Sequence, residues 1–157
     1  ALVYLALDKK SVLQVMFKQA HNMKIVEFMA NERVWGKERF QAAACKNASV
    51  LLSRQNYLLS ATFFLLGGQL VDACRLIMER LECPQLALLV ARLVQGDDGD
   101  DYKRFVSLHL LPLALEQGKV GLAAALLWRL QRYSEAYRVG WDANLADSLR
   151  SVDERGA

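Results

Sequence analysis

The spacing of its apolar residues constrains this chain more than any other feature of its sequence. Large apolar residues recur every three to four positions along almost the whole chain, as in Leu13, Met16 and Phe17. That interval is the period of an α-helix with one buried face, and no segment sustains the apolar–polar alternation of a half-buried strand. Leu and Ala, which favour helix, dominate the composition. The sequence therefore predicts an all-α protein.

Turn signals divide the chain into predicted helices. The first is expected after Asp8 as its N-cap, with Leu13, Met16, Phe17 and Ala20 on its inner face. Gly67-Gly68 suits a helix end, and Pro84 suits the first turn of a helix. Further helices are expected at residues 25–31, 36–55, 57–66, 70–81, 84–95, 105–111, 120–130 and 133–139, with a break or bend near Pro112.

An internal echo indicates that these helices repeat as a unit. Leu51, Gln55, Ala61 and Leu65 recur 62 residues later as Leu113, Gln117, Ala123 and Leu127, and with one extra residue Asp72-Ala73 matches Glu135-Ala136. That period corresponds to two helical hairpins of the length found in helix-turn-helix repeats. Because short connections place consecutive helices antiparallel, the sequence predicts an α-solenoid of antiparallel helical hairpins, similar to tetratricopeptide repeats.

We expect residues 1–150 to form one segment of this α-solenoid and residues 151–157 to be a frayed tail. The chain opens in mid-pattern with Ala-Leu-Val-Tyr-Leu-Ala-Leu, and its hydrophobic content of 54% is somewhat high for a soluble domain. Both features are expected of a segment of a longer polypeptide whose neighbours cover its apolar faces. The longest stretch without charged residues, 55–71, contains Gln, Asn and Gly and has too short an apolar part to span a membrane.

No set of residues has the pattern of an active site, a cofactor site or a metal site. Cys45, Cys74 and Cys83 are widely spaced among apolar neighbours, and with His21 and His109 they show no zinc-ligand spacing. Motifs of nucleotide-binding loops, serine hydrolases and zinc proteases are absent, and the acidic run 97–101 lacks the ligand pattern of a calcium loop. The sequence predicts a non-catalytic protein without a cofactor, in a reducing compartment.

His109 and the aromatic residues have a simpler interpretation than a binding site. His109 lies among leucines and is expected to be a partly buried core residue. Trp35, Phe63, Phe64 and Trp128 fall on apolar helix faces, where we expect core packing.

Positive charge is concentrated near the beginning of the chain. Nine Lys or Arg stand against three Glu between Lys9 and Arg54, whereas the net charge of the whole chain is only +3. A basic face could meet an acidic protein or an anionic membrane surface, although a solvated helix face explains the same excess. No basic-and-aromatic pattern indicates nucleic-acid binding. The candidate protein-contact face comprises Lys9, Lys10, Lys18, Lys24, Arg33, Lys37 and Arg39.

Five segments in order along the chain carry a family resemblance. They are Tyr4-Leu-Ala-Leu-Asp-Lys-Lys-Ser-Val-Leu13, Trp35 with Ala42-Ala-Ala-Cys-Lys-Asn-Ala48, Phe63-Phe-Leu-Leu-Gly-Gly-Gln-Leu-Val-Asp-Ala73, residues 86–93 and residues 111–114. They resemble the corresponding segments of the DmX-like/rabconnectin family, which includes the large subunit of the yeast RAVE complex. The resemblance covers about residues 1–140. The chain departs from the family at Val34, where an Arg is usual, and at residues 123–125, which are small here.

The resemblance implies a long cytosolic protein with β-propellers before an α-solenoid, which promotes joining of the V1 sector of the V-type proton pump to its V0 sector. The implied partners are V1 subunits and other subunits of the assembly complex. The implied location is the cytoplasm, with peripheral association with vacuolar or endosomal membranes. The alternative function is that of an α-solenoid segment in a vesicle-coat or tethering complex.

Overall fold

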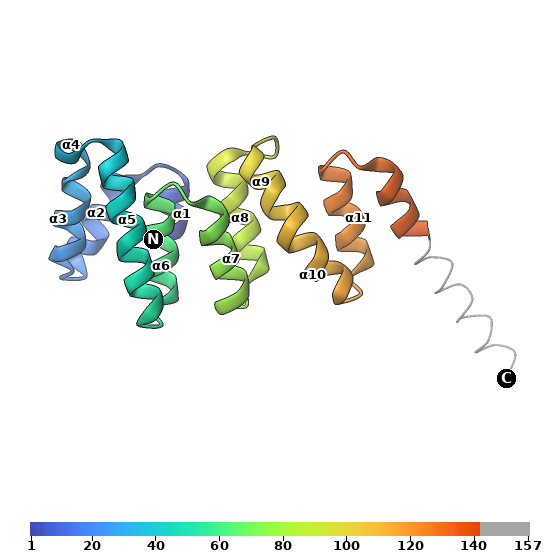
Figure 1. The fold of residues 1–157 in the computed structure, drawn as a ribbon, viewed down its shortest axis with the longest axis horizontal. Helices are drawn as coiled ribbons and strands as arrows, with labels where there is room; N and C mark the ends of the chain where they lie inside the picture. Colours follow the sequence, from blue (N-terminus) through green and yellow to red (C-terminus); the bar gives the residue numbers. More distant parts are fainter. Residues whose placement is uncertain (142–157) are drawn as a thin grey trace, which may run out of the picture. The chain divides into compact units, whose positions relative to one another are not determined.

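The computed structural model describes residues 1–141, and those residues are helical with short turns between the helices. The predicted all-α class and the stacking of antiparallel helical hairpins are confirmed (Figure 1). The described residues divide into two units, residues 1–102 and 103–141, and each is described by itself. The predicted tail at residues 151–157 lies outside the described residues.

The first unit contains eight complete helices and the beginning of a ninth among its described residues. They are α1 Leu2–Ala6, α2 Lys10–Gln19, α3 Met23–Ala30, α4 Glu32–Trp35, α5 Lys37–Ser53, α6 Tyr57–Leu66, α7 Leu70–Arg80, α8 Pro84–Gln95 and α9 Asp100–Phe105. From α5 to α8 each helix packs on the next in the sequence, antiparallel to it (Figure 1). The short helix α1 also packs against α6 and α8, which follow it by more than fifty residues.

Four turns of this unit share one backbone geometry. Asp8, His21, Gln55 and Gly68 each adopt a left-handed conformation, with φ of 55°, 55°, 60° and 75°. In each turn the next residue's N–H donates to the carbonyl five residues before it, as Asn56 donates to Leu51 at 3.0 Å. This is the Schellman arrangement that closes a helix. The prediction that Asp8 caps a helix N-terminus is therefore wrong: Asp8 closes α1, and Lys9 stands at the N-cap of α2.

The core of the first unit is built from a recurring position. The fourth residue of α2, α6, α7 and α8 is fully buried in each case, and these residues are Leu13, Ser60, Ala73 and Ala87. Ser60, Ala73 and Ala87 have small side chains, which let neighbouring helices approach closely. Ala44 and Ala48 of α5 are fully buried as well, and the Ser60 hydroxyl donates to the Ala48 carbonyl at 2.8 Å.

The second unit continues the pattern. Its described part contains the end of α9, the π-helical turn η1 Val106–Leu110, α10 Leu111–Glu116, α11 Val120–Arg129 and a last helical stretch at residues 133–141. Of the predicted break or bend near Pro112, the break is wrong, because helical structure continues from η1 into α10; the irregularity at this place is the π-helical turn η1 itself. Pro112 lacks an N–H and its ring crowds the carbonyl one turn back, and the wider π-turn accommodates both effects.

The internal echo is real, but its period is 63 residues in the structure. The left-handed residues Gln55 and Gly68 of the first unit correspond to Gly118 and Gln131 of the second, and buried Ser60 corresponds to buried Ala123. The echo read from the sequence, at 62 residues, pairs Ala61 with Ala123. The structural equivalent of Ala123 is Ser60, so this echo is displaced by one position. Its second part, which pairs Ala73 with Ala136, is in register.

Candidate protein-contact surfaces

The structure distributes the seven predicted contact residues over two ends of the first unit. Lys9, Lys18, Lys24, Arg33, Lys37 and Arg39 are exposed, and Lys10 is half-buried. Lys9 and Lys10 lie at the start of α2, Arg33 on α4, and Lys37 and Arg39 at the start of α5. Lys18 and Lys24 lie where α2 ends and α3 begins. Arg39 already has a partner, since its guanidinium lies 5.5 Å from the centre of the Trp35 ring.

One group of basic residues surrounds a carboxylate. The Lys10 ammonium lies 2.5 Å from a carboxylate oxygen of Glu32, and the same two residues line a hollow of about 560 Å³ together with Lys37 and Asp8. Arg33 lines an adjoining hollow that also includes Lys10 and Glu32. In the hollow of about 560 Å³, two cations, Lys10 and Lys37, face two carboxylates, Asp8 and Glu32, so the charges of its lining cancel.

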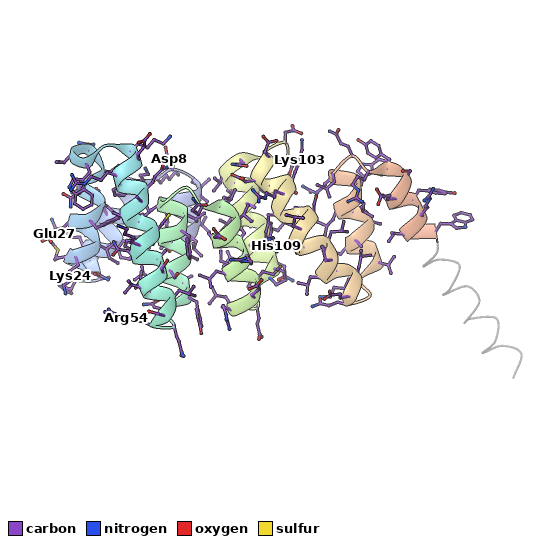
Figure 2. All side chains as sticks on the ribbon, in the orientation of Figure 1. Asp8, Lys24, Glu27, Arg54, Lys103 and His109 are labelled. Carbon is purple, nitrogen blue, oxygen red and sulfur yellow. The ribbon has the colours of Figure 1, made fainter. Side chains whose placement is uncertain are left out.

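A second group of polar residues surrounds a groove between α3 and α5, which we call the α3–α5 groove. Its volume is about 390 Å³. Its lining consists of Asn22, Lys24, Ile25, Phe28, Asn47, Val50, Leu51, Arg54, Leu59 and Phe63. Lys24 and Arg54 lie toward the same end of α3 and α5, whereas Asp8 lies toward the other end of the unit (Figure 2).

The bottom of the α3–α5 groove is apolar and formed by packed side chains. The Phe28 ring packs against Phe63 at 5.2 Å and against Phe40 at 5.0 Å, measured between ring centroids. Phe28, Leu51 and Leu59 are half-buried against the core of the unit. Their remaining exposed surface, with that of Val50, is available to an incoming apolar side chain.

The α3–α5 groove differs in charge from the other hollows of the first unit described here. Its lining contains two cationic side chains and no carboxylate. The two hollows beside Lys10 and Glu32 contain at least one Asp or Glu each, as does a third hollow between α6 and α7, which Asp72 and Glu79 line. Within residues 1–141, the side chains of Lys24 and Arg54 form no ion pair or hydrogen bond. Glu27, one turn after Lys24 on α3, does not line the groove.

The cysteine thiols and His109, which could in principle be reactive, lie in packed surroundings. Burial raises the pKa of the Cys74 thiol to about 12, and the Cys74 sulfur lies 3.4 Å from the Ala87 carbonyl oxygen. Burial, with a smaller effect from the charge of Asp72, also raises the pKa of Cys45. Thiols of raised pKa hold little thiolate and are poor nucleophiles. His109 is half-buried beside Phe105 at 6.1 Å, as predicted.

The acidic run is held by its own neighbours. Asp97 pairs with Arg92 at 3.0 Å, and the Gln95 side chain donates to the Asp101 carboxylate at 2.8 Å. The Gln95 side-chain oxygen also accepts the Asp101 backbone N–H at 3.0 Å, at the start of α9. Among residues 1–141 no group of three or more His, Cys, Asp and Glu could hold a metal ion. Every helix of that range is too short or too polar to cross a membrane.

The second unit exposes aromatic residues that sequence reasoning missed. Trp128 is 64% exposed, so its predicted core position is wrong, and its ring packs edge-on against Tyr133 at 4.7 Å. Tyr137 and Trp141, both exposed, stack at 5.7 Å. The buried face of α11 is formed by Ala123, Leu126 and Leu127, and counting that face would have shown Trp128 lying beside it.

The described residues thus define an all-α helical-repeat protein with shallow hollows and exposed aromatic side chains on its surface. Residues 1–141 match the family described as RAVE protein 1 C terminal, and the chain belongs to that family, as its motifs indicated. It is similar to "Regulator of V-ATPase in vacuolar membrane protein 1" of Saccharomyces cerevisiae, with 32% identity over 142 residues. It is also similar to "DmX-like protein 1" of Mus musculus, with 33% identity over 149 residues.

These relatives are far longer than this chain. The matched region covers 88% of the chain and 10% of the Saccharomyces cerevisiae protein, and 87% of the chain and 5% of the mouse protein. A protein of Schizosaccharomyces pombe with the same name as the budding-yeast relative is 31% identical over 121 residues, which are 74% of the chain and 9% of that protein.

Proposed function

We propose that this chain is a non-catalytic scaffold segment of a V-ATPase assembly factor, which promotes joining of the V1 sector to the V0 sector through protein–protein contacts. The observation that carries the proposal is the family match over residues 1–141, since relatives in two yeasts are named as regulators of V-ATPase in the vacuolar membrane. The stacked helical hairpins fit this role, because repeat folds present extended binding surfaces.

The proposed partners are V1 subunits and other subunits of the assembly complex. The proposed location is the cytoplasm, with peripheral association with vacuolar or endosomal membranes. In this proposal residues 1–150 are one α-solenoid segment of a longer protein. The buried Cys74 thiol fits a non-catalytic segment, and the groove with a basic rim and an apolar bottom fits a surface that binds proteins. No observation favours the alternative of a vesicle-coat or tethering complex.

The test is purification of the full-length protein that contains this chain from cytosol, with its partners identified by mass spectrometry. We expect V1 subunits to be enriched, and more strongly when the pump is disassembled. In cells without the protein, we expect less V1 on vacuolar or endosomal membranes at unchanged V0. Recovery of coat or tether subunits without V1 would contradict the proposal, as would a normal amount of membrane-bound V1 in the deletion strain.

A further inference from the structure

We propose that the α3–α5 groove binds an acidic amphipathic segment of a partner protein, with an apolar side chain in the groove and carboxylates at Lys24 and Arg54. This inference rests on the proposed function in one respect, which is that the chain works through protein contacts. It goes further by assigning one contact surface and the chemistry of the segment that occupies it.

The charges at the rim select an acidic partner. Lys24 comes from the first turn of α3 and Arg54 follows the last turn of α5, so two elements bring the cations to one groove. Neither side chain forms an ion pair within residues 1–141, and the lining holds no carboxylate to neutralise them. Complementary charge at a rim guides association and suppresses partners of like charge. The uncompensated rim therefore favours a segment that carries Asp or Glu.

The bottom of the groove selects an apolar side chain between those carboxylates. Phe28 and Phe63 form its aromatic base, and Val50 remains 47% exposed at its wall. The volume of about 390 Å³ lies near the lower end of the range of about 300–1,000 Å³ that small-molecule pockets span, so the groove has room for an apolar side chain. A bare anionic membrane surface would use the cations and leave this apolar surface unfilled. The combination of charge and shape thus favours a protein segment.

The test places a photo-crosslinking amino acid at position 47 of the full-length protein. Asn47 is exposed and lines the α3–α5 groove, so the crosslinker reaches an occupant without filling the apolar bottom. Crosslinked peptides from the native complex are sequenced by mass spectrometry. The charge-reversal variant is Lys24→Glu/Arg54→Glu. Its matched control is Lys46→Glu/Lys119→Glu, which makes the same change of charge at exposed residues outside the groove.

We expect the crosslinked segment to carry at least two carboxylates around an apolar residue. Its yield should fall about tenfold or more in Lys24→Glu/Arg54→Glu, because attraction becomes repulsion, and should be unchanged in the control. Replacing the partner's carboxylates by Lys should restore the crosslink to the charge-reversed protein. An unfolded variant could not be rescued in this way, so rescue separates a lost contact from a lost fold.

Several results would overturn the inference. These are a crosslink that survives charge reversal, a segment without carboxylates, a crosslink only to lipid or to the same protein, and the absence of any crosslink from the intact complex. Charge-dependent flotation with phosphatidylcholine–phosphatidylserine vesicles, without a protein crosslink, would assign the groove to membranes and refute it too. V1 recovery is measured in the same samples: wild-type protein without V1 refutes the proposed function alone, whereas V1 without the crosslink refutes only the groove.

Discussion

Substituting Gly67 by Ala tests how closely the end of α6 approaches α5. Gly67 has φ of −77° and ψ of −1°, a conformation that any residue adopts without strain. A Cβ added there would overlap the sulfur of Cys45 and would lie 3.2 Å from the carbonyl oxygen of Gln41. The substitution therefore sets a steric cost against a gain in backbone entropy.

The steric cost and the entropic gain differ enough in size to predict the sign of the change in the free energy of unfolding. Replacing Gly by Ala at a compatible backbone stabilises by about 0.4–1 kcal/mol, because the unfolded chain loses freedom. Forcing a methyl group into a packed site costs about 1–3 kcal/mol. We expect Gly67→Ala to lower the free energy of unfolding by about 1 kcal/mol. In a Cys45→Ala background the sulfur is gone, so the same change should be nearly neutral, with a coupling of about 1–2 kcal/mol between the two sites.

The assay is urea unfolding of the wild-type chain, both single variants and the double variant, followed by circular dichroism and fitted with a common slope. The double variant should have nearly the same free energy of unfolding as Cys45→Ala alone. If Gly67→Ala stabilises the chain, or if removing the Cys45 sulfur gives no rescue, the close approach of these two elements is wrong.

Four further variants, each at a single residue, are all measured by urea unfolding. Burial raises the pKa of the Cys74 thiol from 9.0 to about 12. The stability contributed by the protonated thiol is therefore complete below pH 9 and is lost as the pH rises from 9 towards 12. Cys74→Ala should reduce this alkaline loss of stability, and an equal loss in the variant would contradict the prediction. Gly121 lies in the first turn of α11 with no atom within 4 Å of an added Cβ, so Gly121→Ala should stabilise by about 0.5 kcal/mol; Gly96→Ala, at φ of +74°, should instead destabilise by about 1 kcal/mol or more. Ser60→Ala removes the hydrogen bond to the Ala48 carbonyl and should cost about 0.5–1.5 kcal/mol, and no loss would show that the hydroxyl is not needed between α5 and α6.

Much of the local structure could be predicted from the sequence. The helix expected at residues 57–66 is α6 with the same bounds, and the helix expected to begin at Pro84 is α8. Both depend on interactions within a few residues: apolar periodicity, a glycine where a helix closes, and a proline where the missing N–H is harmless. The family motifs were legible for the same reason, since they are contiguous in the sequence.

Features that depend on distant residues could not be predicted in this way. Asp8 has the side chain of an N-cap, and only the presence of α1 before it makes it the residue that closes a helix. Trp128 lies beside the buried face of α11, a difference of one position that an approximate periodicity does not resolve.

The candidate contact surface shows the same division most clearly. The sequence by itself determined that basic residues are concentrated between Lys9 and Arg54 and that helices carry them. Tertiary structure decided that Lys10 is paired with Glu32, and that Lys24 and Arg54 stand at one apolar groove although thirty positions separate them. The physical reason is that local sequence sets a helix and its apolar face, whereas packing of several helices sets which charges meet and which remain unpaired.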